Sequence, residues 1–125
     1  MKKITIEDVF QQKNIKKETE MFFDSETLGG RIDFEKIQPD KVLDILQDTG
    51  KGLMSAHDAN LYLIYLSVPM FRNAELLEKF EIKDSPYKVI DAIFKSDVLE
   101  ITTFADKILT LYGFQAQKVK KIKKS

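Results

Sequence analysis

Few residues of this chain belong to the types that carry out catalysis or hold metals. The sequence has one histidine, His57, and no cysteine, so thiolate metal sites, thiol nucleophiles and disulfides are excluded. His57 lies in the stretch Ser55–Asp58, which has the pattern of a helix N-terminus, where the helix dipole disfavours a charged imidazolium. No second histidine is present to share a metal. We therefore predict that His57 is an exposed residue in the first turn of a helix.

Carboxylates and a Gly-Gly pair are the other groups that could do chemistry. The 20 acidic residues could include a catalytic pair of the kind that glycosidases use, or a nuclease-like arrangement. Most of them stand near lysines at helical spacing, as Glu75 does with Lys79, which is typical of surface pairing. Gly29-Gly30 lacks the Lys-Ser/Thr that follows in a phosphate-binding loop, so we interpret it as a turn. We predict a protein that is not an enzyme and uses no cofactor or metal.

Charge is distributed unevenly along the chain, although the net charge is zero. The stretch KVKKIKKS, residues 118–125, holds five lysines and no acid, while the rest holds 15 basic and 20 acidic side chains. Such a tail could be a handle for nucleic acid or for an acidic protein surface, or simply a solvated chain end. It has no arginine or aromatic residue, which weakens the nucleic-acid hypothesis. We expect a single globular domain over 1–117 and a flexible tail after it.

The most apolar stretch is LYLIYLSVPMF, residues 61–71. Its eleven residues are too few to span a membrane, which takes about 20. The opening MKKITIEDVF has acidic residues where a signal peptide would have an apolar core. We therefore expect a cytoplasmic protein with no membrane partner. We interpret the stretch as a core helix that ends near Ser67 or Val68, because Pro69 lacks the amide that a continuing helix needs.

Turn and capping signals divide the chain into a short hairpin and a series of helices. We predict an α+β fold that is mainly α-helical, with about five helices packed with a small N-terminal β-hairpin. The hairpin is predicted over about 16–37, with a loop of about seven residues in DSETLGG, and the helical part over about 40–113. Helix start signals stand at Thr5 (for a short helix over about 6–12), Pro39, Ser55, Asn73, Ser85-Pro86 and Asp97.

Apolar residues beyond those that one core needs are candidates for partner contacts. In the last predicted helix the main apolar face runs over Val98–Tyr112, and Phe104 and Leu111 form a second stripe beside it. Met70 and Phe71 follow the helix-stopping proline. Exposed together, these side chains would form a patch for a partner helix or for a second copy of the chain. The predicted partner-binding residues are Met70, Phe71, Phe104 and Leu111, with Lys118, Lys120, Lys121, Lys123 and Lys124 of the tail assisting.

The order of elements in the second half of the chain resembles that of a known family. An Ile-Tyr-x-Ser-x-Pro helix, here Ile64–Pro69, is followed by a short leucine-rich helix, Asn73–Phe80. A helix opened by proline comes next, Ser85–Ile90, and then a last helix ending in Gly-Phe, Ile108–Phe114, before the lysine-rich tail. Over about 60–125 this pattern resembles the tail assembly chaperones of siphophages, myophages and defective prophages, the XkdN-like group.

The resemblance implies a non-enzymatic protein of the host bacterial cytoplasm. Such a chaperone coats the tape-measure protein until tail-tube subunits polymerise around it, and it is absent from the mature virion. The family also implies a contact with the tail-tube protein, made in many phages by a longer, frameshifted product. Two other functions stay open. A small nucleic-acid-binding regulator using the basic tail would bind in a steeply salt-dependent way, and a structural tail-completion protein would be present in purified particles.

Overall fold

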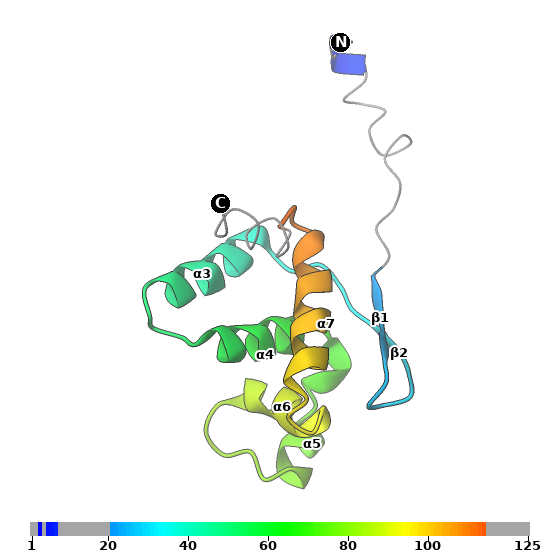
Figure 1. Ribbon diagram of the computed structural model, residues 1–125, viewed down its shortest axis with the longest axis vertical. Coiled ribbons are helices and arrows are strands. Elements are labelled where there is room, and N and C mark those ends of the chain that lie inside the picture. The colour runs from blue at the N-terminus through cyan, green and yellow to red at the C-terminus, as the bar shows by residue number, and fades with distance from the viewer. Residues whose placement is uncertain (1–2, 4, 8–20, 115–125) are drawn as a thin grey trace.

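The chain folds as a two-stranded hairpin followed by a series of helices (Figure 1). The computed structural model describes residues 3, 5–7 and 21–114. Within these residues, five α-helices and one antiparallel hairpin confirm the predicted α+β, mainly helical fold. The helix predicted over 6–12 lies mostly outside the described residues, and the tail over 118–125 lies entirely outside them. The elements are β1 (Phe22–Ser25), β2 (Gly30–Asp33), α3 (Pro39–Gly50), α4 (Ala56–Ser67), the 3-10 helix η1 (Pro69–Phe71), α5 (Ala74–Lys79), the 3-10 helix η2 (Pro86–Lys88), α6 (Val89–Ile93) and α7 (Val98–Thr110).

The hairpin is tighter than the sequence predicts. The ladder between β1 and β2 ends where Ser25 lies opposite Gly30, so the loop consists of residues 26–29 only. Gly29 closes this loop with φ of +71°, a conformation that suits glycine, and its amide donates to the Ser25 carbonyl oxygen at 2.9 Å. The prediction of a loop of about seven residues is wrong, because Asp24, Ser25 and Gly30 pair within the ladder.

Most of the predicted helix starts are formed by the residues that signal them. The side chains of Ser55, Asn73 and Asp97 accept hydrogen bonds of 2.8–3.0 Å from amides in the first turns of α4, α5 and α7. Each bond satisfies an amide that the helix itself leaves unpaired. Pro39 and Pro86 occupy the first positions of α3 and η2, where a missing amide costs nothing. Local sequence therefore decides where these elements begin.

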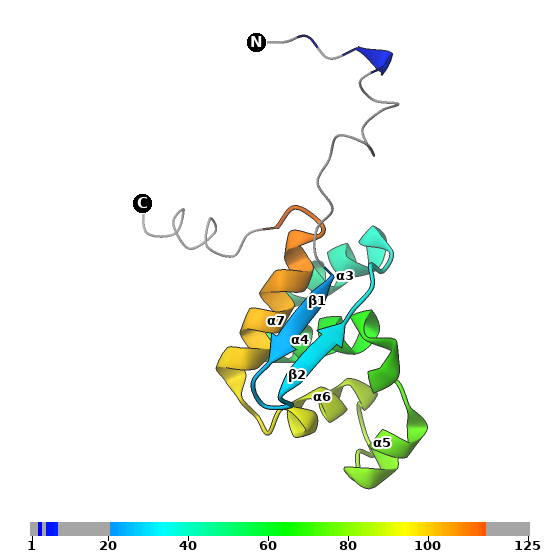
Figure 2. The same cartoon turned by 90° about the vertical axis from the view of Figure 1, so that its right-hand side faces the viewer.

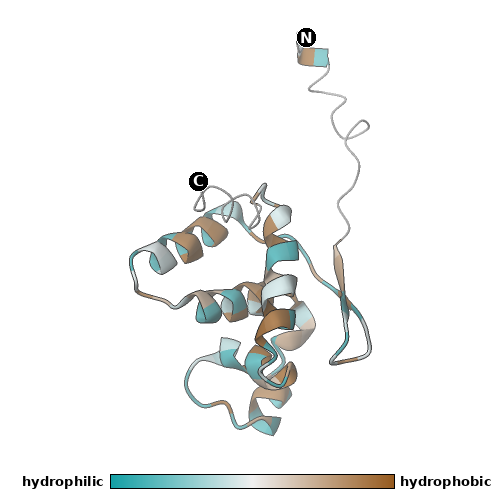
Figure 3. Ribbon diagram, in the orientation of Figure 1, coloured by the Kyte–Doolittle hydropathy of each residue, from teal (hydrophilic) through white to brown (hydrophobic). Residues whose placement is uncertain are grey.

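The core lies where α4, α6 and α7 meet. Figure 1 shows α3 and the hairpin on opposite sides of α7, and Figure 2 shows the strands lying along α7. Hydrophobic residues are concentrated around this centre (Figure 3). Burial of apolar area contributes on the order of 25 cal/mol per Å² to folding, so the side chains buried at this junction stabilise the fold. Its largest fully buried side chains are Leu61, Ile64, Ile90, Phe94, Ile101, Phe104 and Ile108.

The prediction that Phe104 belongs to an exposed stripe is wrong. Its side chain is completely buried, because the hairpin covers this face of α7. The ring of Phe23 in β1 stacks on that of Phe104, with centroids 4.4 Å apart and planes inclined by 8°. Phe34 and Phe94 pack against the same ring at 5.8 and 6.0 Å. The second apolar stripe of α7 therefore completes the core instead of facing a partner.

Hydrogen bonds to Glu100 hold the hairpin loop on the first turn of α7. One carboxylate oxygen accepts from the Ser25 hydroxyl at 2.7 Å, and the other accepts from the amide and the hydroxyl of Thr27, both at 3.1 Å. Ser25 is buried, so its hydroxyl requires such an acceptor. The Ser25 oxygen in turn accepts from the Leu28 amide at 3.0 Å. Glu100 thereby fixes where Leu28 lies.

Tyr112, which follows α7, fastens the segment that enters α3. Its phenol oxygen accepts from the Ile37 amide at 2.7 Å and donates to the Ile37 carbonyl oxygen, 3.2 Å away. Burial raises the pKa of Tyr112, and the hydrogen bond with the Ile37 backbone opposes that increase in part. The phenol is therefore held in its neutral form.

We expect Glu100→Gln to lower the free energy of unfolding by about 1–3 kcal/mol, because the amide leaves at least one loop donor without its acceptor. Glu26→Gln is the matched control, since Glu26 is an exposed carboxylate of the same loop, and it should change the free energy by less than about 0.5 kcal/mol. Urea denaturation measures both. Equal effects of the two substitutions would contradict the role assigned to Glu100.

We expect the raised pKa of Tyr112 to cost stability in alkaline solution. Below about pH 10 the phenol is neutral in both states, and above it the unfolded chain ionises first, so stability is lost as pH rises through the folded pKa. Tyr112→Phe should be less stable at about pH 8, by about 1 kcal/mol, because Ile37 loses its partner. The variant should then lose less stability than the original protein between about pH 8 and about pH 10.5. Equal losses, measured from urea midpoints, would contradict this prediction.

Candidate functional site

An open apolar groove lies where the hairpin loop, η1, α5 and α6 come together. Its volume is about 310 Å³. Three of its apolar side chains are well exposed: Met70 at 56%, Leu28 at 47% and Phe80 at 36%. Apolar side chains gathered in this way are typical of a surface that binds a partner. We name it the Met70 groove, and it is lined by Leu28, Met70, Phe71, Leu76, Lys79, Phe80 and Ile93.

Pro69 creates one side of the groove. α4 ends at Ser67, and η1 turns the chain, with the amides of Phe71 and Arg72 each donating at 3.0 Å to the carbonyl oxygens of Val68 and Pro69. The turn places successive side chains on opposite sides. Phe71 is only 4% exposed and packs edge-on against Phe94, whereas Met70 projects into solvent. Two neighbouring residues of the apolar stretch therefore have different environments: Met70 lies at the surface and Phe71 in the core.

α5 forms the other side of the groove and is itself lightly packed. None of its residues is fully buried, and Leu76 and Leu77 are half-buried. Phe80, which follows these leucines at helical spacing, is partly exposed at the end of this helix. The predicted surface pair of Glu75 with Lys79 is not among the salt bridges of the described residues. Lys79 is the one charged residue among those that line the groove. It has no carboxylate partner in the described part of the chain.

The four apolar residues predicted to bind a partner do not form one exposed patch. Met70 is exposed as predicted and lines the groove, but Phe71 is buried in the groove floor, so the prediction of its exposure is wrong. Phe104 is buried under the hairpin, and Leu111 is half-buried just after α7. The five lysines of the tail, Lys118 to Lys124, lie outside the described residues, and their role stays a prediction.

Leu28 and Phe80 are the groove residues that the sequence reasoning missed as surface candidates. Leu28 is an apolar residue in the polar loop DSETLGG, which is a signal that could have marked it. Phe80 follows the leucines of α5 at helical spacing and looks like a core residue for that reason. Its exposure depends on how lightly α5 packs, which no local pattern encodes.

His57 lies in the first turn of α4, as predicted, but it is half-buried and joined to α6, so the prediction that it is exposed is wrong. Its Nε2 lies 3.0 Å from Oδ1 of Asp91, and the two side chains are 36% and 35% exposed. The other oxygen of Asp91 accepts from the Ser96 hydroxyl at 2.9 Å. In this order the carboxylate separates the hydroxyl from the imidazole, so His57 is not placed to take a proton from Ser96. The three residues connect α4 with the end of α6.

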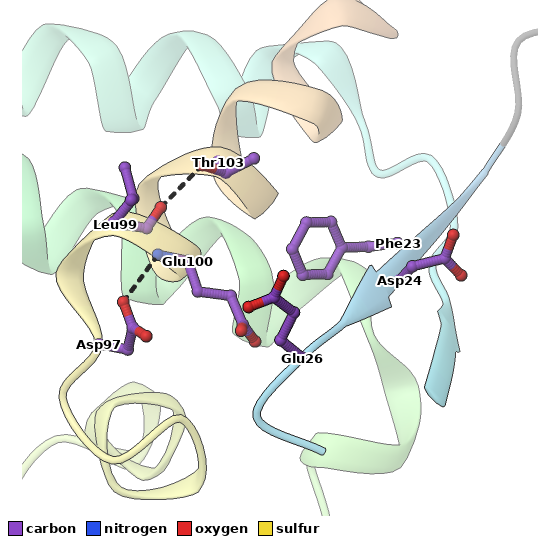
Figure 4. Close-up of a pocket in the computed structure, with 7 residues that line it drawn as sticks. All are labelled: Phe23, Asp24, Glu26, Asp97, Leu99, Glu100 and Thr103. Atoms are coloured by element: carbon purple, nitrogen blue, oxygen red, sulfur yellow. Dashed lines mark hydrogen bonds between the residues drawn. The ribbon is translucent and has the colours of Figure 1, made fainter. Parts of the chain in front are cut away.

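A second cavity, of about 240 Å³, lies between the hairpin and the first turn of α7 (Figure 4). Four of its lining residues are acidic: Asp24, Glu26, Asp97 and Glu100. Asp97 caps α7 by accepting from the Glu100 amide, and the Glu100 carboxylate holds the hairpin loop. Over residues 21–114 and the few described before them, no group of three or more side chains could hold a metal ion. Asp97 and Glu100 therefore serve the fold.

Comparison of the chain with protein-family models, with curated proteins and with solved structures finds no match. Among the helices described, none is long and apolar enough to cross a lipid bilayer. The Met70 groove combines three exposed apolar side chains with a concave surface, and we take it as the candidate functional site.

We expect the two residues after Pro69 to differ sharply in their contribution to stability. Phe71→Ala should lower the free energy of unfolding by about 3–5 kcal/mol, because it leaves a cavity beside Phe94. Met70→Ala should change it by less than about 0.5 kcal/mol, because Met70 is mostly in solvent. Urea denaturation of the two variants measures the difference. Comparable losses would show that Met70 is part of the core.

Proposed function

We propose that this protein is a non-enzymatic phage or prophage tail assembly chaperone whose Met70 groove binds apolar segments of the tape-measure protein. The observation that carries the proposal is the exposed apolar lining at Met70, Leu28 and Phe80. It is supported by the sequence resemblance over about 60–125. In this role the protein acts in the host cytoplasm, keeps its client soluble until the tail tube forms, and is left out of the finished particle.

The chemistry of the groove suits an amphipathic helix. Such a helix would place apolar side chains, three or four residues apart, between Met70 and Phe80. Lys79 would attract a carboxylate on the same client helix, which would favour one orientation over the other. A long helical client with exposed apolar side chains needs this kind of cover before assembly.

Weak binding at each groove suits a chaperone that must be released. The Met70 groove is open and shallow, and a single such contact buries little area. Many copies along one long client would bind through avidity, and would leave one by one as the tail-tube protein polymerises. A contact with the tail-tube protein and self-association stay predictions from the sequence.

We expect charged substitutions in the groove to abolish the chaperone activity. The test is co-expression with the tape-measure protein of the same phage or prophage, with the soluble fraction of that protein measured. Met70→Lys combined with Leu28→Lys should return the soluble fraction to its level without the chaperone. Both side chains are about half exposed, so the fold should persist.

The matched control is Leu43→Lys combined with Leu53→Lys. These leucines are 46% and 74% exposed and do not line the groove. The control should solubilise the client as well as the original protein does. Failure of the original protein to solubilise or co-purify with the tape-measure protein would overturn the proposal, and equal loss in both variants would overturn the role of the groove. Salt-sensitive DNA binding would instead favour a regulator, and presence in purified particles would favour a tail-completion protein.

A further inference from the structure

A second groove, of about 450 Å³, lies between the segment that enters α3 and the end of α4. Hydrogen bonds fix its walls: the Glu35 amide donates to the Ser67 carbonyl oxygen at 2.8 Å, and Tyr112 holds Ile37 on both of its backbone groups. A surface that is already ordered loses little entropy when a partner binds. We name it the basic groove, and its lining includes Glu35, Lys36, Ile37, Lys41, Leu66 and Arg72.

The lining of the basic groove includes three cationic side chains and one acidic side chain. Lys36, Lys41 and Arg72 come from three different segments, and none of them forms a salt bridge with a carboxylate in the part of the chain that the structure describes. The ammonium groups of Lys36 and Lys41 lie over the rings of Tyr112 and Tyr62, each 5.6 Å from the centroid. Outside the tail the chain holds more acidic than basic side chains, 20 against 15. The three cations are therefore concentrated in one groove whose lining holds a single acid, Glu35.

Arg72 is held in a way that keeps part of its guanidinium available. Its Nη1 donates to the carbonyl oxygens of Tyr65 and Leu66, which the end of α4 leaves unpaired. Nε and Nη2 make no hydrogen bond to the described residues. A guanidinium anchored at one nitrogen is preorganised to bind a carboxylate through its others.

We propose that the basic groove binds an acidic, partly apolar peptide segment of a partner protein. Carboxylates of the segment would pair with Arg72 and the two lysines, and apolar side chains would pack on Ile37 and Leu66, which are both half-buried. A nucleic acid suits the groove less well. Glu35 and the acidic body would repel its phosphates, and the lysines cover the two tyrosine rings on which bases could stack.

The two grooves meet at η1. Met70 and Phe71 line the apolar groove, and the next residue, Arg72, lines the basic one. The chain thus presents two surfaces of different chemistry on neighbouring residues, so that one copy can hold two different segments. The inference about the basic groove does not depend on the client proposed for the Met70 groove.

The probe for the test is a fluorescein-labelled peptide of alternating glutamate and leucine residues, titrated into the full chain. Fluorescence anisotropy measures the affinity, and NMR locates the site. We expect the methyl and amide signals of Ile37, Leu66 and Arg72 to shift. A peptide with glutamine in place of glutamate should bind much more weakly, and added salt should weaken binding of the acidic peptide.

Lys36→Glu combined with Lys41→Glu should weaken binding by about ten-fold or more. Both side chains are exposed and neither takes part in the hydrogen bonds that fix the groove, so these substitutions should leave the fold intact. Lys51→Glu combined with Lys83→Glu is the matched control, because these exposed lysines line neither groove. The tail is unchanged in every protein, so any binding by the tail is common to all of them.

Three results would overturn the proposal. The first is the absence of shifts at Ile37 and Leu66 with the peptide at millimolar concentration. The second is equal affinity in the groove variant and the control. The third is tighter binding of a single-stranded oligothymidylate than of the peptide, with the same dependence on Lys36 and Lys41, which would assign the groove to nucleic acid. None of these outcomes bears on the tape-measure experiment.

Discussion

The contact between the hairpin and α7 is the constraint on which the rest of the structure depends. A two-stranded hairpin is scarcely stable alone, and the hairpin covers the Phe104 ring of α7. The stacked rings of Phe23 and Phe104 join the two elements, and Glu100 adds hydrogen bonds at the loop. The same bonds position Leu28 at the Met70 groove. The position of Leu28 in the candidate site therefore depends on the contact between the hairpin and α7.

Pro69 determines how the apolar stretch that contains it is used. It ends α4 and starts a tight turn, so that Phe71 completes the core while Met70 stays in solvent. The same turn brings Arg72 to the unpaired carbonyl oxygens at the end of α4. One helix stop thus generates an apolar groove and a basic groove beside each other. Exposed apolar side chains line the first groove and three cations line the second, and we propose that both bind partners.

Local signals predicted much of this fold. The caps at Ser55, Asn73 and Asp97 and the stop at Pro69 act through residues that are near in sequence. The helix starts predicted from Pro39 onward and the mainly helical fold are confirmed. Burial of Phe104 was not predictable from helical periodicity, since it depends on strands about 80 residues earlier in the chain. The Met70 groove was predictable only in part, because some of its residues also depend on contacts between distant segments. Met70 follows from the proline, whereas Leu28 and Phe80 reach the site only through tertiary packing.

Site-specific photocrosslinking tests the central claim, that the surface beside Pro69 holds the client, most directly. A photoreactive amino acid would replace Met70 in one variant and Leu53 in another, and each variant would be co-expressed with the tape-measure protein. Both positions are exposed, so access to solvent does not distinguish them. We predict a crosslink to the tape-measure protein from position 70 and little or none from position 53. Solubilised client without a crosslink from position 70, or equal yields from both positions, would contradict the claim.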